Sequence, residues 1–432
     1  MRYKALISSV MAGFLAMMTP LPALAEEAAA PALNTGDTAW MLISSALVLL
    51  MLPGLALFYG GMVRAKNVLS TMMHSFVVMG LIAVQWLVIG YTIGFGDDRG
   101  GFVGGLNKLF LSGITIETLS NTIPEFIFAM FQAMFAIITI ALISGAVAER
   151  IKFSAYCLFA VLWSTLVYDP IAHWVWGGGW LAKLTPAALD FAGGTVVHLS
   201  SGISALALIM FLGKRHGFPT ERMAPHSLPL TLLGAGLLWF GWYGFNAGSA
   251  LAANGTAALA FTTTTVAPAA GGLAWMFAEW IHAGKPSALG FASGVVAGLV
   301  AITPAAGFVS PAWALVIGIG AGIICYLAVL MKAKLKYDDS LDAFGIHGVG
   351  GAFGAIATGA FATVGATGLI MGNMGQFVSQ LIAVGAAGAY AFIVTCILAF
   401  VLDKTIGLRV DKEDEIMGLD QTQHSESGYN LF

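Results

Sequence analysis

The chain has 432 residues, of which 58% are hydrophobic and only 9% are charged, and its mean hydropathy is +0.87. A soluble domain carries about 25% charged residues, so this composition excludes a soluble protein and indicates an integral membrane protein. The formal net charge of -3 is small, which argues against a nucleic-acid partner. The three cysteines lie in apolar runs without the paired spacing of a metal site or a disulfide framework.

Residues 1–25 are predicted to be a cleaved signal peptide. A basic start is followed by an apolar stretch and then by Ala-Leu-Ala at 23–25, a small-x-small cleavage site. The alternative is a first transmembrane helix. However, the stretch falls short of the about 20 residues needed to span, and Pro20 and Pro22 follow it. Cleavage predicts a bacterial inner-membrane protein with its mature N-terminus outside.

Residues 26–402 are predicted to form one all-α membrane domain with eleven transmembrane helices. Each apolar window is near the length needed to cross a bilayer. The windows are 39–63, 68–95, 124–148, 153–170, 191–213, 228–246, 258–283, 288–304, 311–331, 341–363 and 376–402. A further apolar stretch, 171–182, is too short to span and is expected to form a re-entrant or interfacial segment on the outer face. Residues 403–432 are polar and are expected to form a cytoplasmic tail, partly disordered when alone.

The basic residues support this topology. With the N-terminus outside, the outer loops hold only Arg99, Lys108 and Lys183, whereas the inner loops hold most of the remaining lysines and arginines. This excess satisfies the positive-inside rule and places the C-terminus inside. Eleven spans can be divided into an inverted repeat of five plus five helices and one extra helix, an organisation found in many transport proteins.

Two histidines inside spans are the main functional candidates. His198 follows Asp190 on the fifth span, and His347 follows Asp342 on the tenth, so they occupy matching positions in the two halves. In a soluble core such residues are usually packing histidines, but an ionisable group within a membrane span is costly and indicates function. The repeat predicts that the two side chains approach each other near a pseudo-two-fold axis.

The remaining residue pattern favours a channel or a gradient-driven transporter for a small polar solute. The sequence lacks a Gly-x-x-x-x-Gly-Lys-Ser/Thr loop for ATP, and the span interiors have few of the acids that an ion path requires. Neutral imidazole has one donor and one acceptor nitrogen and can carry a proton near neutrality. A solute that sheds a proton and crosses as a neutral molecule fits such a lining. An enzyme is the alternative from another class, but two lone imidazoles provide no nucleophile–base pair.

Four stretches carry a more specific pattern: residues 56–61 (ALFYGG), 190–198 (DFAGGTVVH), 241–249 (GWYGFNAGS) and 344–348 (FGIHG). In this order they resemble the ammonium transporter (Amt/Mep/Rh) family over nearly the whole chain. The resemblance implies eleven helices, an inverted repeat, and a homotrimer in the membrane lipid with one pore per subunit. It implies no cofactor and no metal.

The resemblance also implies an outer ammonium-binding site. By position, Trp176, Phe135 and Ser249 match the family's recruitment site, where aromatic faces attract a cation. Phe135 and Phe245 match a stacked phenyl gate below it. Trp176 and Ser249 resemble the Amt branch more than the Rh branch, which usually lacks this pair.

Further matches lie along the implied pore. His198 and His347 match twin histidines that share a hydrogen bond. Asp190 matches an acid that shapes the outer site without binding ammonium directly, and Trp242 and Tyr59 match pore-lining aromatics. The resemblance implies a mechanism in which recruited ammonium loses its proton. Ammonia then crosses past the two histidines, which relay the proton.

The tail resembles Amt tails whose cytoplasmic face is blocked by a trimeric PII signal protein. Its matching segments are residues 407–410 (GLRV) and 418–420 (GLD), with His424 and Tyr429 beyond them. Where the family usually has His-Gly-Glu, this chain has His-Ser-Glu at 424–426. An alternative function is a transporter-like ammonium sensor that signals through this tail.

Overall fold

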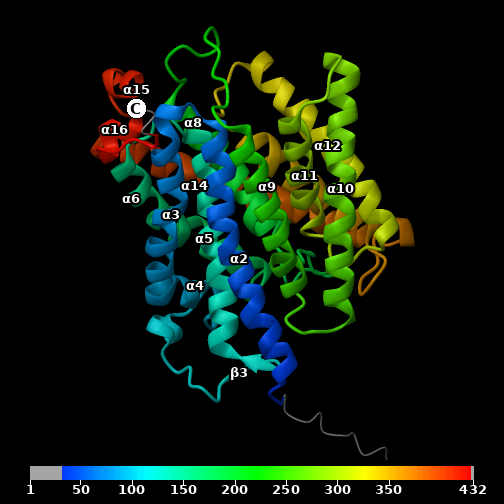
Figure 1. Ribbon diagram of the computed structural model, residues 1–432. Coiled ribbons are helices and arrows are strands. Elements are labelled where there is room, and N and C mark those ends of the chain that lie inside the picture. Colours follow the sequence, from blue (N-terminus) through cyan, green and yellow to red (C-terminus); the bar gives the residue numbers. More distant parts are fainter. Residues whose placement is uncertain (1–31, 430–432) are drawn as a thin grey trace, which may run out of the picture.

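The computed structural model describes residues 32–429 as a bundle of membrane-length helices (Figure 1). In this part of the chain, ten helical segments are long and apolar enough to cross a membrane, and the shorter apolar helix Ala288–Ile302 lies among them. Together they make the eleven expected members of the bundle. The predicted signal peptide lies outside the described residues.

Several spans consist of more than one helical element, because short π-helical turns interrupt them. In chain order, the spans are α2 (Thr35–Met62); η1 (Ala65–Asn67), α3 (Val68–Gln85), η2 (Trp86–Gly90) and α4 (Tyr91–Phe95); α5 (Glu125–Val147); α6 (Phe153–Trp163), η4 (Ser164–Tyr168) and α7 (Asp169–Val175); η5 (Gly194–Leu199) and α8 (Ser200–Leu212); α9 (Leu228–Trp242) and η6 (Tyr243–Ala247); α10 (Gly255–Ala283); α11 (Ala288–Ile302); α12 (Pro311–Leu335); η7 (Phe344–Gly348) and α13 (Val349–Phe361); and α14 (Met374–Thr405).

Polar residues at the span boundaries explain where several helices begin. The side chains of Asn34, Asn254, Ser287 and Asn373 each accept a hydrogen bond from a backbone N–H in the first turn of the helix that follows. The first backbone N–H groups of a helix have no partner within the helix, and these side chains satisfy one of them at each start.

The fourth span is longer than the sequence predicted, so the expected re-entrant segment is wrong in its first part. Residues 171–175 continue the helix to Val175, and only the residues from Trp176 onward leave it. Pro170 itself cannot donate a backbone hydrogen bond and would disturb a regular α-helix at this point. The π-helical turn Ser164–Tyr168 directly precedes this region, and such a turn already lacks the α-helical bonding pattern, so the helix accommodates the proline.

The fifth and tenth spans share a local structure that supports the inverted repeat. Each begins with a π-helical turn, and each turn carries one of the candidate histidines, His198 in η5 and His347 in η7. The two turns contact each other, and each also packs against the helix that continues the other span. Close packing depends on glycine here, because a Cβ on Gly202 would lie 2.0 Å from the backbone nitrogen of Gly348.

Two short antiparallel hairpins lie at the end of the bundle that the sequence predicts to be outside; it is called the outer end below, and the opposite end the inner end. Strands β1 (Asp98–Arg99) and β2 (Val103–Gly104) form one, and β3 (Leu119–Ser120) and β4 (Ile123–Pro124) form the other. The 3-10 turn η3 (Leu106–Leu111) lies between them, and another, η8 (Leu369–Met371), precedes α14. In Figure 1, β3 lies at the end of the bundle opposite the C-terminal helices.

A buried charge cluster connects four inner loops. It consists of Arg64, Glu149, Arg150, Arg215 and Asp338. The Glu149 carboxylate accepts hydrogen bonds from Arg64 at 2.9 Å and from Arg215 at 3.0 Å, and Asp338 pairs with Arg215 at 2.8 Å. Burial alone would raise the pKa of both acids, but hydrogen bonds and positive charge from the arginines outweigh it and lower both pKa values. The cluster therefore holds ionised groups and joins the inner ends of several spans.

The tail forms two short helices on the bundle, whereas its predicted partial disorder concerns the tail alone. Helix α16 (Leu419–His424) lies against the inner end of α3, and α15 (Lys412–Met417) packs against α16. The backbone nitrogen of Leu419 donates to Oδ1 of Asn67 at 2.8 Å, and that of Ser70 donates to Oδ1 of Asp420 at 2.8 Å. Leu419 is fully buried. The bundle therefore provides hydrogen-bond partners that the tail alone would lack.

Candidate functional site

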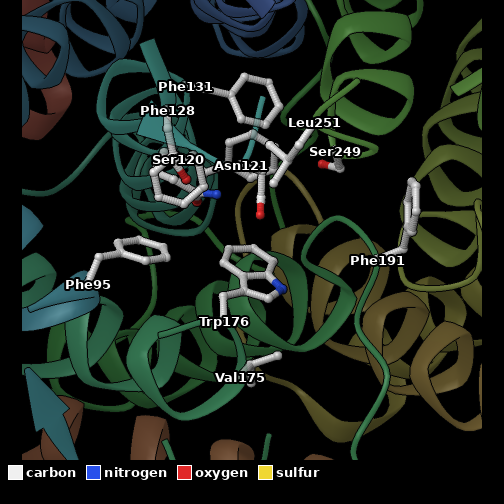
Figure 2. A pocket seen from close by; sticks show the side chains of 12 residues that line it. Phe95, Ser120, Asn121, Phe128, Phe131, Val175, Trp176, Phe191, Ser249 and Leu251 are labelled. Carbon is white, nitrogen blue, oxygen red and sulfur yellow. The ribbon is translucent and has the colours of Figure 1, made fainter. Parts of the chain in front are cut away.

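A cavity of about 460 Å³ opens at the outer end of the bundle and contains the three residues predicted to recruit the substrate. Figure 2 shows Trp176 and Ser249 facing a common space, with Phe131 beside it. The lining comes from α5, from the turn after α7, from the β3–β4 hairpin and from the segment after η6. The lining residues are Phe95, Ser120, Asn121, Phe128, Phe131, Gln132, Phe135, Val175, Trp176, Phe191, Ser249 and Leu251.

The cavity provides aromatic faces and hydrogen-bond acceptors. The Ser249 hydroxyl donates to the carbonyl oxygen of Phe245 at 2.8 Å, so its lone pairs remain available to accept. The Oε1 atom of Gln132 is buried without a partner within residues 32–429. The indole Nε1 of Trp176 donates to the carbonyl oxygen of Asp190 at 2.8 Å, which fixes the ring at the cavity wall. A small cation with N–H donors matches these acceptors and π faces.

Two stacked phenyl rings separate this cavity from the interior. The ring centroids of Phe135 and Phe245 are 4.2 Å apart, and the planes differ by 28°. Trp176 meets the edge of Phe135 at 5.9 Å, with an interplanar angle of 89°. Both phenylalanines are buried, so the stack closes the path below the cavity. A hydrated ion cannot pass unless these rings move.

Below the phenyl stack lies a narrow apolar lumen. Its free volume is about 10 Å³, near the minimum that holds one water molecule. Two imidazoles interrupt an otherwise hydrophobic lining. The lining residues are Met51, Leu55, Phe58, Ile138, Leu142, His198, Leu238, Trp242, Phe245, Val296 and His347.

His198 and His347 meet in this lumen, as the repeat predicted. Their Nδ1 atoms are 3.3 Å apart, and the ring planes differ by 24°. A hydrogen bond between two Nδ1 atoms needs one donor and one acceptor, so one ring carries its proton on Nδ1 and the other on Nε2 when both are neutral. Nε2 of His198 has no partner among the described residues. The pair can therefore change tautomers together and pass a proton between rings.

Trp242 and a threonine that the sequence analysis missed support His198. The Trp242 ring stacks on His198 with centroids 5.4 Å apart, and its Nε1 donates to Oγ1 of Thr303 at 2.9 Å. Thr303 follows directly after α11. No motif singled it out, because its partner is 61 residues away in the chain.

Two buried acids stabilise the turns that carry the histidines. Asp190 accepts hydrogen bonds from the backbone N–H groups of residues 193–196, at 2.7, 2.7, 2.8 and 3.0 Å. Asp339 accepts from Ala343 at 3.0 Å and from Phe344 at 2.8 Å. Burial, together with the charge of Asp342, raises the pKa of Asp339 to about 6. Each acid lies eight residues before its histidine, so Asp339 rather than Asp342 corresponds to Asp190.

Most of the predicted site residues lie along one line from the outer cavity to the histidines. Trp176, Phe135 and Ser249 line the cavity, and Phe245 and Trp242 lie between it and the paired imidazoles. Tyr59 is the exception. Its ring is buried against α5 and its hydroxyl donates to the carbonyl oxygen of Leu142 at 3.1 Å, while Phe58 lines the lumen in its place. Gln132 and Asn121 line the cavity but were not predicted, since isolated polar residues give no pattern.

Comparisons with known proteins show which family the chain belongs to. A family model described as Ammonium Transporter Family matches residues 39–429. Ammonium transporter Amt1 of Archaeoglobus fulgidus is 52% identical over 92% of this chain and 100% of its own length. The ammonium transporter of Bacillus subtilis is 49% identical over 92% of this chain and 99% of its own. The crystal structure of Candida albicans Mep2 superposes with a TM-score of 0.83, at 37% identity over 88% of this chain and 87% of that one.

Proposed function

The chain belongs to the ammonium transporter family, and we propose that it recruits ammonium in the outer cavity, removes a proton and conducts ammonia past the paired histidines. It is a multi-pass membrane transporter rather than an enzyme. The observation that carries the proposed mechanism is the change in width and polarity along the path from the outer cavity to the histidines. A wide polar-aromatic cavity ends at a phenyl stack, and a lumen with room for about one small molecule follows.

Recruitment is assigned to Trp176, Phe135 and Ser249. The ring faces attract a cation, worth roughly 0.5–2 kcal/mol and more when the cation is desolvated. The Ser249 hydroxyl, already a donor to Phe245, accepts a hydrogen bond from one ammonium N–H. Gln132 lines the same cavity with an unpartnered oxygen and provides a second acceptor.

Deprotonation explains selectivity against potassium. A charged ion would pay a large desolvation cost in an apolar lumen with about 10 Å³ of free volume. Ammonium avoids this desolvation cost by losing a proton and entering as neutral ammonia, whereas potassium has no proton to lose. The phenyl stack of Phe135 and Phe245 excludes water at this point, so ammonia enters a dry path.

Transfer of the proton that ammonium loses is assigned to the histidine pair. Nε2 of His198 is unpartnered and accepts or donates according to the tautomer, and the 3.3 Å contact between the Nδ1 atoms connects it to His347. A proton taken by one ring releases the shared proton to the other. Ammonia and proton then cross the same region by different routes.

Purified protein in proteoliposomes tests the mechanism through current and internal pH together. Ammonium is expected to produce a current, because the relay carries the proton, whereas an equal concentration of potassium produces none. Alkalinisation without current would mean conduction of neutral ammonia alone and would remove the relay from the proposal. If neither signal exceeds that of protein-free liposomes, transport itself is contradicted.

We further propose a homotrimer in the bacterial inner membrane, with the N-terminus outside and the C-terminus inside. An apolar groove between α10 and α12 supports a contact surface between subunits within the membrane. It is lined by Ala270, Leu273, Ala274, Phe277, Ala278, Ile281, Leu315, Ile319 and Ile323. This groove suits either lipid chains or a neighbouring subunit. The cluster of arginines among the inner loops supports the orientation.

We also propose that a PII-type signal protein binds the cytoplasmic face and blocks the pore exit. The ordered tail supports this proposal, because α15 and α16 present a fixed surface beside the inner charge cluster. Ser425, at the family's glycine position, adopts a positive φ of 57°. A PII protein of the same organism is expected to bind the full chain and not a chain ended after Thr405. Equal binding by both would contradict a tail-dependent site, and the His282→Ala variant at another inner position is the control.

The alternative of an ammonium sensor is not favoured, because the curated relatives described above are named as transporters.

A further inference from the structure

A polar cluster outside the pore holds the turn that carries Trp176. His173 lies in the last turn of α7, and its side chain is fully buried. Its Nδ1 lies 3.0 Å from the carbonyl oxygen of Gly94, and its Nε2 lies 2.9 Å from Oδ1 of Asp98. One imidazole therefore ties α7 both to the end of α4 and to the β1–β2 hairpin.

Both partners of this ring are hydrogen-bond acceptors. A carbonyl oxygen and a carboxylate only accept hydrogen bonds, so each ring nitrogen of His173 faces an acceptor. Asp98 is an ionised acceptor, since it also receives hydrogen bonds from the backbone of Gly101 at 2.8 Å and from Lys183 at 2.6 Å. Hydrogen bonds from His173 and then Lys183 hold the pKa of Asp98 well below its usual range.

The ring and the turn after Trp176 are packed without spare room. The backbone nitrogens of Gly177 and Gly179 donate to the carbonyl oxygen of His173 at 3.0 and 2.9 Å. A Cβ on Gly177 would lie 2.0 Å from the oxygen of Gly94 and 2.7 Å from Nδ1 of His173. The turn therefore rests directly on the ring and its partner. A displacement of the His173 ring would displace the backbone that carries Trp176.

We propose that His173, held between the Gly94 carbonyl oxygen and the Asp98 carboxylate, is a positioning residue that fixes Trp176 in the outer ammonium-binding cavity. The inference rests on the proposed function, because it requires Trp176 to bind the substrate. His173 is not among the residues that line the cavity, so it acts through Trp176. Loss of the contact between His173 and Asp98 weakens ammonium recruitment and leaves passage beyond the phenyl stack unchanged.

The test compares half-saturating ammonium concentration with maximal current in proteoliposomes. In the H173Q variant, a flexible amide replaces the imidazole ring that contacts both Gly94 and Asp98. The half-saturating concentration is expected to rise about fivefold to tenfold, the size of one lost hydrogen bond, with little change in maximal current. W176L is expected to raise the half-saturating concentration by a similar factor. The double variant should show no further rise, because both changes remove the same interaction between Trp176 and ammonium. K183Q, which keeps the bond between His173 and Asp98, is the matched control and should behave like the unmodified chain.

The outcomes separate this inference from the proposed function. If W176L leaves the half-saturating concentration unchanged, the recruitment site itself is wrong. If W176L raises it and H173Q does not, or if the two effects multiply in the double variant, only the positioning role is overturned. Should H173Q fail to fold, D98N carries the same expectation at a partly exposed position. A folded D98N that behaves like the unmodified chain, or loss of fold in both variants, also overturns the positioning role.

Discussion

Replacing His198 with alanine is expected to reduce the ammonium-dependent current about 100-fold, the lower range for removal of a group that transfers a proton. The substitution removes the unpartnered Nε2 and the 3.3 Å contact with Nδ1 of His347. A proton released by ammonium then meets a single imidazole, His347, with no second ring to receive the proton from it. Current and internal pH, recorded together in proteoliposomes, measure the effect.

His347→Ala should cause a loss of similar size, and the double variant should be little worse than either single one. Residues that act as a unit show such non-additive effects. His282→Ala is the matched control, because that imidazole bonds to the Tyr326 hydroxyl at 2.7 Å, away from the lumen. Unchanged current in His198→Ala would exclude the relay, whatever the double variant does.

The second large effect is expected at Asp190. Asp190→Asn replaces one acceptor oxygen by an NH₂ group that faces backbone donors, so about two of the four hydrogen bonds are lost. Hydrogen bonds to a charged group contribute about 1.5–3 kcal/mol each, which gives a destabilisation of roughly 3–6 kcal/mol. The turn Gly194–Leu199 would lose its support, and transport should fall with it. Thermal unfolding in detergent and transport assays measure the two effects.

Asp339→Asn provides the comparison within the same molecule. Asp339 supports the matching turn in the other half through only two backbone hydrogen bonds. Asp339→Asn should therefore lower the melting temperature less than Asp190→Asn does. Equal destabilisation by both variants would contradict the assignment of stability to the number of bonded N–H groups. It would instead indicate that burial of the acid determines the cost.

The bundle was predictable because each span needs an uninterrupted apolar stretch, and these stretches are visible without knowledge of any contact. The meeting of His198 and His347 was predictable for a related reason, since an inverted repeat places matching positions near its axis. The resemblance to a known family contributed the phenyl stack and the recruitment residues, which composition and spacing alone did not identify.

Features that depend on distant partners were not predictable. The fourth span was ended at residue 170, because the π-helical turn that lets the helix continue past this point leaves no clear mark in the sequence. Asp342, being nearer to His347, seemed to match Asp190, but hydrogen-bond geometry assigns that role to Asp339. Thr303 and Gln132 are single polar residues in apolar surroundings, and their importance follows only from what other helices place beside them.

The docked tail has a consequence for how the protein is made. The residues that begin the second span, Lys66 and Asn67, bond to residues of the tail that are synthesised about 350 positions later. The inner end of the second span thus acquires these partners only after the last span, which ends at Thr405, has been synthesised. A premature stop codon between that span and α15 would leave every span intact and still release a chain whose second span lacks these contacts.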